Sequence, residues 1–448
     1  AKSITELERK LKQVDGVNRV ITAYDALGDT IPIEILPSEI RNKISKNNSN
    51  LMLITYKDST SSEETLKAVD EVKKITKDKC KIGGMSALVL DTMNLSNREI
   101  LIYIVIAVLL CLLVLELVLN SYLIAPLLLL NIGIAILFNM GTNIFLGEIS
   151  YITKALVAVL QLGVTTDFSI FLIHSYENKK NKYASKDEAM SEAIRETFSS
   201  VLGSSLTTVA GFLVLCTMKL TLGRDLGIVM AKGVIIGVIS VLTIFPSMIL
   251  IADKWIEKTK HKPLLPSFSK VSEFIVKYRY VFLALFLILI LPMYIANTKT
   301  SIYYKLDESL PDNLDSIIAN TELKEKFNIA SPEIILIDKN LKTEKINEMI
   351  SEIESLDGID FIISTSKLDN MGLTSEMLPK EISNSLESDK YKMILLNSTY
   401  DIATNELNEQ TENIEKIIAK YDEHAILAGE GPLMKDLVKI SDEDFRSV

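Results

Sequence analysis

The sequence has 448 residues, a formal net charge of −10 and a mean hydropathy of +0.26, although 24% of its residues are charged. Such values occur together only when apolar and charged residues lie in separate stretches, which excludes a single soluble domain, a disordered chain and a disulfide scaffold. The acidic balance also argues against a nucleic-acid partner.

In chain order, a polar segment over residues 1–99 is followed by six apolar segments. A helix of roughly 20 residues crosses about 30 Å of hydrocarbon, so each segment is a predicted membrane span. The spans cover residues 100–119, 122–140, 152–173, 197–218, 227–251 and 280–295. We expect a five-helix bundle at 100–251, a cytoplasmic linker at 252–279, a further span at 280–296 and a second polar domain at 297–448.

The positive charges of the short loops predict the orientation of these spans. Residues 174–196 carry five Lys or Arg and residues 252–279 carry seven, whereas 141–151 carry none and 219–226 carry two. The two lysine-rich segments are therefore predicted to be cytoplasmic. It follows by parity that the polar segments 1–99 and 297–448 are both extracytoplasmic.

The two polar segments resemble one another, which indicates an internal repeat. Residues 14–17 (VDGV) match residues 356–359 (LDGI), 342 positions later, and Asp91 matches Asp436, 345 positions later. Each copy reads helix, strand, strand, helix and a polar helix that leads into the membrane, as in a split βαβ or ferredoxin-like α+β domain. The repeat also predicts that the chain is truncated at both ends and that a second five-span bundle completes a known transporter plan.

One carboxylate, Asp167, lies deep in the apolar segment 152–173. An ionisable group in a membrane span costs about 2.5–3.5 kcal/mol on insertion scales, so such groups usually face a bundle interior and have a function. Because burial opposes ionisation, protonation of Asp167 can be coupled to a change of conformation, as in a proton relay. The alternative is a structural polar contact with the next helix.

The predicted neighbours of Asp167, either in the relay or in helix packing, are small or hydroxylated residues and one phenylalanine. They are Gly163, Thr166, Phe168, Ser204, Ser205 and Thr208. His174, seven residues after Asp167, is a candidate for proton exit, with an interfacial histidine as the alternative. Lys232 is expected to reach water, and the lysine-rich run 179–186 is expected to be a solvated loop.

The motifs of common enzymes are missing from the sequence. It contains no GxxxxGK[ST] loop, no HExxH, no GxSxG and no paired-carboxylate site. The three cysteines, Cys80, Cys111 and Cys216, have no metal-ligand or redox spacing. We therefore expect no enzyme activity, no bound metal and no cofactor.

The segment GVTTDFSIFLIHSYEN at 163–178 resembles the resistance-nodulation-division superfamily, and most closely its MMPL branch of membrane exporters. Supporting similarities are the glycine- and hydroxyl-rich stretch 203–211, LGRDLG at 222–227, Phe245-Pro246 at the end of a span, and LPD at 310–312. Phe168 stands where this family usually has tyrosine, and Ser175 stands where arginine is common.

The resemblance implies proton-motive export of lipids or other hydrophobic compounds through extracytoplasmic porter domains, with Asp167 as the protonated carboxylate. The implied partners are membrane lipids, a hydrophobic substrate, protons and the missing second bundle of the same protein; a homo-oligomer is left open. The implied location is the plasma membrane. The alternatives are a lipid- or sterol-sensing protein that does not transport and a SecDF-like accessory of protein secretion.

Overall fold

The computed structural model describes residues 2–22, 45–46, 49–261, 269–299, 310–370 and 386–447. The chain divides into two compact units. We call Ala1–Leu95 with Tyr303–Lys439 the polar unit, and Ser96–Ile302 with Ile440–Val448 the helical unit.

Within the described ranges, six helices are long and apolar enough to cross a membrane, which confirms the six predicted spans. They are α4 (Met85–Val118), α5 (Ile124–Gly141), α6 (Tyr151–Lys180), α7 (Lys186–Val214), α8 (Thr221–Lys258) and α10 (Arg279–Thr298). Short 3-10 turns follow α5 and α7, and a small helix α9 (Ser269–Lys277) precedes α10.

The helices are longer than the apolar segments that predicted them. The α4 helix begins at Met85 and crosses residue 100 without a break, and α8 continues past Pro246 to Lys258. The polar starts of α6 and α7 are capped, because the hydroxyls of Ser150 and Ser185 accept hydrogen bonds from backbone N–H groups of the first turn. Hydropathy therefore predicts the membrane-spanning part of a helix but not the polar turns that extend it at either end.

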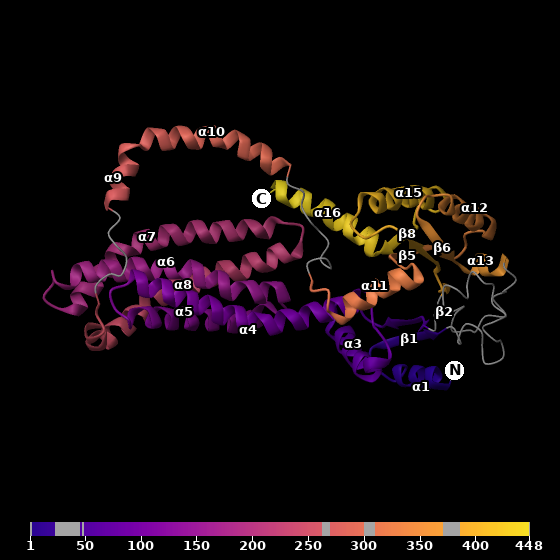
Figure 1. Cartoon of the computed structure of the whole chain (residues 1–448), viewed down its shortest axis with the longest axis horizontal. Helices are drawn as coiled ribbons and strands as arrows, with labels where there is room; N and C mark the ends of the chain where they lie inside the picture. Colours follow the sequence, from indigo (N-terminus) through magenta and orange to yellow (C-terminus); the bar gives the residue numbers. More distant parts are fainter. Residues whose placement is uncertain are drawn as a thin grey trace. The chain divides into compact units, whose positions relative to one another are not determined.

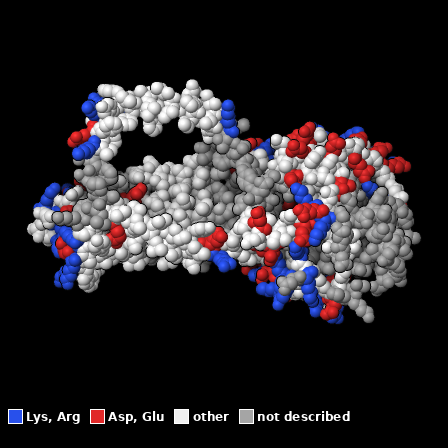
Figure 2. Space-filling model, in the orientation of Figure 1, with Lys and Arg blue, Asp and Glu red and all other residues white. Residues whose placement is uncertain are grey.

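The bundle is built around α8, which packs against α5, α6 and α7 (Figure 1). Its apolar core includes Ile132 of α5, Leu172 of α6, Val201 of α7 and Phe245 of α8, all fully buried. By contrast, no described residue of α10 is buried. Figure 2 shows the charge segregation expected from the sequence, with few charged side chains along the helices.

The second polar segment forms an antiparallel sheet in the order β6-β7-β5-β8. This arrangement of a βαββαβ chain confirms the predicted α+β split βαβ fold. Its elements are β5 (Ser331–Asp338), α12 (Thr343–Glu354), β6 (Ile359–Ile363), α13 (Thr365–Asn370), β7 (Tyr391–Ser398), α15 (Asn405–Tyr421), β8 (Ile426–Gly429) and α16 (Glu430–Ser447). Apolar residues of β5 and β7 pack against α12 and α15 to form its core.

The first polar segment repeats part of that fold. Its elements are α1 (Lys2–Leu11), β1 (Val17–Thr22), the two-residue strands β2 (Ser45–Lys46) and β3 (Ser49–Asn50), β4 (Met52–Tyr56) and α3 (Glu63–Thr76). Val20 pairs with Ile54, just as Ile362 pairs with Leu396, both 342 positions later. Even the register shift recurs, at 17–19 and at 359–361. The repeat seen in the sequence is thus present in the backbone.

The two copies differ at their outer strand. In the second copy, β8 exists as a strand because it pairs with β5. The described part of the first copy has no counterpart of β5, and its residues 81–84 form no strand. Helix α11 (Asp315–Phe327) contacts this segment instead, since the side-chain oxygen of Asn320 accepts a hydrogen bond from Gly84 N at 2.8 Å.

Candidate functional site

Asp167 lies near the middle of α6 and is exposed in the described chain. Successive residues of a helix are rotated by about 100°, so residues four and seven apart share a face. Gly163 and His174 lie on this face with Asp167 and are exposed as well. The opposite face carries the buried residues Phe168 and Leu172, which pack into the core. Asp167 therefore points away from the neighbours that hold α6 in place.

The hydroxyl groups expected around Asp167 bind elsewhere. Thr166 donates to Leu162 O at 2.5 Å, Ser205 to Leu202 O at 3.0 Å and Thr208 to Ser204 O at 2.9 Å. The side chain of Asp167 has no hydrogen bond or ion pair in the part of the chain that the structure describes. The expected contacts between α7 and this carboxylate are thus not formed, because short hydroxyl side chains satisfy themselves on carbonyls of their own helix turn.

The glycines around Asp167 leave open space rather than a helix contact. Among the described residues, no atom outside the glycine's own helix backbone lies within 4 Å of the position that a Cβ would take at Gly163, Gly203 or Gly211. The expectation that Gly163 brings a neighbouring helix close is therefore not met within the described residues. Ser204 is exposed too, whereas Ser205 is buried. We call the exposed residues Gly163 and Asp167 of α6 and Gly203, Ser204 and Gly211 of α7 the Asp167 face. Large apolar side chains are exposed on the same side of α6, since Leu160 lies seven residues before Asp167 and Phe171 four residues after it.

Sequence reasoning missed a polar cluster inside the bundle. The amide of Asn139 on α5 donates to Gln161 Oε1 on α6 at 2.9 Å, and Gln161 Nε2 donates to Gly233 O on α8 at 3.1 Å. A Cβ at Gly233 would lie 2.5 Å from Asn139 Nδ2, and one at Gly237 would lie 2.7 Å from Thr165 Oγ1. The GxxxG spacing at 233–237 was the signal for this close packing.

Lys232 is half-buried, and its ammonium makes contacts that the sequence did not predict. Its ammonium donates to Asn139 O and to Thr142 Oγ1, both at 2.9 Å, and also to Asn143 Oδ1. These groups lie at the C-terminal end of α5, where backbone carbonyls have no partners within the helix and attract a positive charge. Lys232 therefore ties α8 to the end of α5.

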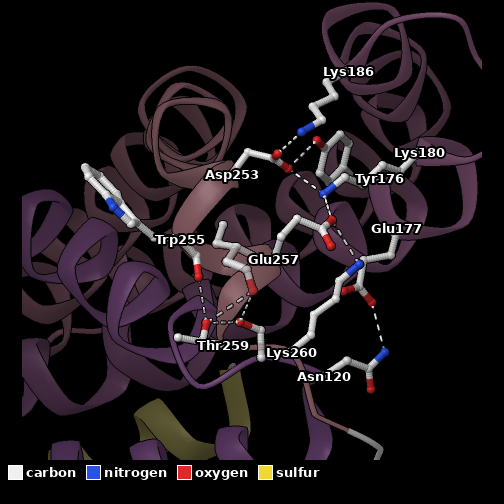
Figure 3. A network of polar contacts seen from close by, with 12 residues as sticks. Asn120, Tyr176, Glu177, Lys180, Lys186, Asp253, Trp255, Glu257, Thr259 and Lys260 are labelled. Carbon is white, nitrogen blue, oxygen red and sulfur yellow. Dashed lines mark hydrogen bonds and ion pairs between the residues drawn. The ribbon is translucent and has the colours of Figure 1, made fainter.

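A second missed feature is a buried acid at the lysine-rich end of the bundle (Figure 3). The side chain of Asp253 on α8 is 4% exposed and forms ion pairs with Lys180 of α6 and Lys186 of α7. The hydroxyl of Tyr176 donates to the same carboxylate at 3.4 Å. The run 179–186 is therefore only partly a solvated loop, since two of its lysines bind a carboxylate that is removed from water.

Further polar contacts extend this cluster to the loop between α4 and α5. Glu257 forms ion pairs with Lys180 and Lys260. The hydroxyl of Ser121 hydrogen bonds with that of Thr259 at 2.8 Å, and Asn120 Nδ2 donates to Glu177 Oε2 at 3.1 Å. We call Asp253, Lys180, Lys186, Tyr176 and Glu257 the basic-end network. It joins α6, α7 and α8 at the end opposite to Lys232.

The remaining candidate residues are His174 and Ser175, both on α6. His174 is exposed, and Ser175 donates a hydrogen bond to Glu196 Oε2 at 2.6 Å. Among the described residues, no group of three or more His, Cys, Asp or Glu is arranged to hold a metal ion. The Asp167 face and the basic-end network are thus the two candidate functional sites of the helical unit.

Comparison with known proteins places these features in a family. The chain is 25% identical to the siderophore exporter MmpL5 of Mycobacterium tuberculosis over 67% of this chain and 33% of that protein. It is 22% identical to the apo-petrobactin exporter of Bacillus anthracis over 92% of this chain and 60% of that protein. The structure of SecDF, a translocon-associated membrane protein from Thermus thermophilus, matches 88% of the chain at 14% identity with a TM-score of 0.41.

The chain spans less than two thirds of the length of either exporter. Its residues 6–277 match the model of the MMPL family, and this segment contains the whole five-helix bundle and the Asp167 face. The resemblance seen in the sequence is confirmed: the chain belongs to the MMPL family of membrane proteins.

Proposed function

We propose that this chain is part of a plasma-membrane exporter that uses the proton-motive force to move lipids or other hydrophobic compounds out of the cell. Membership of the MMPL family supports the membrane and transport parts of the proposal. Two similar proteins are named as exporters, of a siderophore and of apo-petrobactin. In this proposal the two copies of the α+β repeat are extracytoplasmic porter domains.

The observation that carries the proton-driven part is the position of Asp167. This carboxylate lies in the middle of a predicted membrane span, without a partner in the described residues, and Gly163 on the same helical face is exposed as well. Facing lipid, it would cost about 2.5–3.5 kcal/mol on insertion scales. Exposed small residues such as Gly163, Gly203 and Ser204 instead suit close packing by further helices. We propose that the second bundle predicted by the repeat covers this face.

Under such cover, the charge of Asp167 would control which packing is favoured. The ionised carboxylate is poorly solvated between helices, while the protonated form is neutral and can donate a hydrogen bond. A proton that enters from one side and leaves at the other can therefore drive a cycle between two arrangements of the bundles. His174, on the same face and nearer the lysine-rich end, is a proposed exit for the proton.

Replacement of Asp167 in the full-length protein tests the proposal. Asp167→Asn keeps the size of the side chain and removes its titration, so we expect expression at the normal level and loss of export that depends on the proton gradient. Efflux of a fluorescent hydrophobic dye, with and without a protonophore, measures this. The control is Asp58→Asn, an exposed loop position in the polar unit.

Normal efflux by the Asp167→Asn variant would defeat proton coupling through this residue. Binding of a lipid or sterol that persists in the variant, combined with no gradient-dependent efflux in the unaltered protein, would favour the sensor alternative. A defect in protein secretion alone would favour the accessory alternative.

A further inference from the structure

Glu333 is the most unusual buried group in the described polar unit. It lies on the central strand β5, between Leu396 of β7 and Gly429 of β8. Its side chain is on the face of the sheet that packs against helices, and the residue is 1% exposed. The neighbouring inward positions on β5 are Ser331 and Ile335, so the carboxyl lies where the polar end of the domain interior meets its apolar core.

Neither carboxylate oxygen of Glu333 has a hydrogen-bond partner among the described residues. The same is true of three buried oxygens, Ser331 Oγ, Gln410 Oε1 and Thr411 Oγ1. Burial raises the pKa of Glu333 to about 7, and repulsion from Glu415 acts in the same direction. A buried carboxylate without partners is strongly disfavoured as an anion, whereas the neutral acid is tolerated and can donate one hydrogen bond.

The charged groups of the surrounding helices do not compensate an anion at Glu333. From α15 it is approached by Glu415, which has the same charge. Of the two lysines of α16, Lys435 and Lys439, Lys435 is already held by acids of α15, with Nζ at 2.7 Å from Glu415 and 3.9 Å from Glu412. On β7 and β8 its direct neighbours, Leu396 and Gly429, carry no charge.

The turn from β8 into α16 closes over this carboxyl and has room for glycine only. Gly429 has a φ of +150°. A Cβ at Gly429 would lie 2.9 Å from Pro332 O, and one at Gly431 would lie 2.5 Å from Glu333 Oε1. The helix that starts at this turn is shared by both units, since residues up to Lys439 belong to the polar unit and those from Ile440 to the helical unit.

We propose that Glu333 is a second protonation site of this protein, which holds a proton while the β8–α16 turn is closed over it and releases that proton to water when the turn opens. No bond other than that to the proton changes, and the acceptor is solvent. Closed turn and neutral acid thus stabilise one another, as do open turn and carboxylate. The proposal does not depend on proton-driven export.

The sign of the effect follows from linkage. The carboxyl has an ordinary pKa of 4.5 when it is open to water and a pKa of about 7 when it is closed. The opening equilibrium should therefore rise with pH between these values, by up to about tenfold per pH unit, and be flat above pH 8.

Amide hydrogen exchange of the purified full chain in detergent tests this proposal. The exchange rate is followed at residues 426–439. Helix α12 is the internal reference that corrects for the intrinsic pH dependence of exchange. We expect exchange at 426–439 to increase by about tenfold or more between pH 5 and pH 7. In Glu333→Gln, which stays neutral, we expect slow exchange at every pH. Glu333→Leu serves as a second neutral variant should the glutamine disturb folding.

The control is Glu412→Gln, an acid of α15 that is 56% exposed and lies near Lys435. It should keep the pH dependence of the unaltered protein. The proposal is overturned by a pH response that both neutral variants of Glu333 retain, by the absence of any response in the unaltered protein, or by its loss in Glu412→Gln.

Discussion

At the scale of single residues, the basic-end network contains both buried and exposed charged side chains. Asp253 is 4% exposed at its side chain, and its partner Lys180 is 11% exposed, so both have lost most of their hydration. Removing one member of a buried ion pair costs about 3–5 kcal/mol, because the other charge is left without compensation. We expect Asp253→Asn to lower the free energy of unfolding by an amount of this order, measured as a clear fall in the melting temperature of the purified protein.

The matched control is Glu257→Gln, since this acid binds the same lysine but is 41% exposed. Exposed ion pairs contribute about 0–1 kcal/mol, so its melting temperature should hardly change. The double variant Asp253→Asn with Lys180→Met removes both charges and should recover part of the loss. Equal falls in the Asp253 and Glu257 variants would show that burial does not set the strength of this network.

The sequence revealed Asp167 but not Asp253, for a physical reason. A carboxylate in the middle of an apolar run is a local signal, which needs no knowledge of the fold. Asp253 lies close to a helix end, and its two lysines are 73 and 67 positions away in the chain. The direction in which Asp167 points was likewise beyond sequence reasoning, because the rotation of α6 is set by packing of its other face on α5, α7 and α8.

At the scale of elements, the turn before β1 in the first copy and the turn before β6 in the second copy use glycine in the same way. Gly16 and Gly358 have φ angles of +85° and +86°. Their carbonyls accept hydrogen bonds from Lys57 N at 2.9 Å and Thr399 N at 2.8 Å. The VDGV and LDGI matches, which indicated the repeat in the sequence, coincide with this turn, and Asp-Gly is a pair that favours a residue with positive φ.

Gly358→Ala should destabilise the polar unit. An L residue at positive φ costs roughly 1–2 kcal/mol, and the new Cβ would lie 2.4 Å from Cε2 of the Tyr400 ring. The control is Gly84→Ala, because Gly84 has a φ of +93° but no atom within 4 Å of its Cβ position. The control should show only the backbone cost, so the melting temperature should fall further in Gly358→Ala. An equal fall would mean that the Tyr400 ring moves aside freely.

At the scale of the whole molecule, the sequence predicted the six spans and the repeated α+β fold. Hydropathy and internal similarity are properties of the chain itself, and they do not depend on how its segments pack. It could not predict that α4 and α16 each belong to both units. Continuous helices across a domain boundary arise when turns outside the membrane-spanning run, such as Met85–Leu95, are helical as well. The residue composition changes at that boundary, whereas the helical hydrogen bonds of the backbone continue through it.

The orientation of the whole chain in the membrane is a prediction that two cysteine positions can test. The lysine-rich loops should be cytoplasmic, and the polar unit extracytoplasmic, because loops rich in Lys and Arg are retained on the inner side during insertion. Cys80 is exposed in the polar unit, and Lys182 is exposed in the loop between α6 and α7. With Cys111 and Cys216 replaced by serine, Cys80 should react with a membrane-impermeant maleimide in intact cells.

The companion variant carries Lys182→Cys and lacks all three native cysteines. It should react only after the cells are permeabilised, since the reagent cannot cross the intact membrane. Labelling of both proteins after permeabilisation controls for thiols that are simply unreactive. Labelling of the Lys182→Cys variant in intact cells, with Cys80 protected, would show that the chain has the opposite orientation. Both α+β copies would then face the cytoplasm and could not act as porter domains on the outer side.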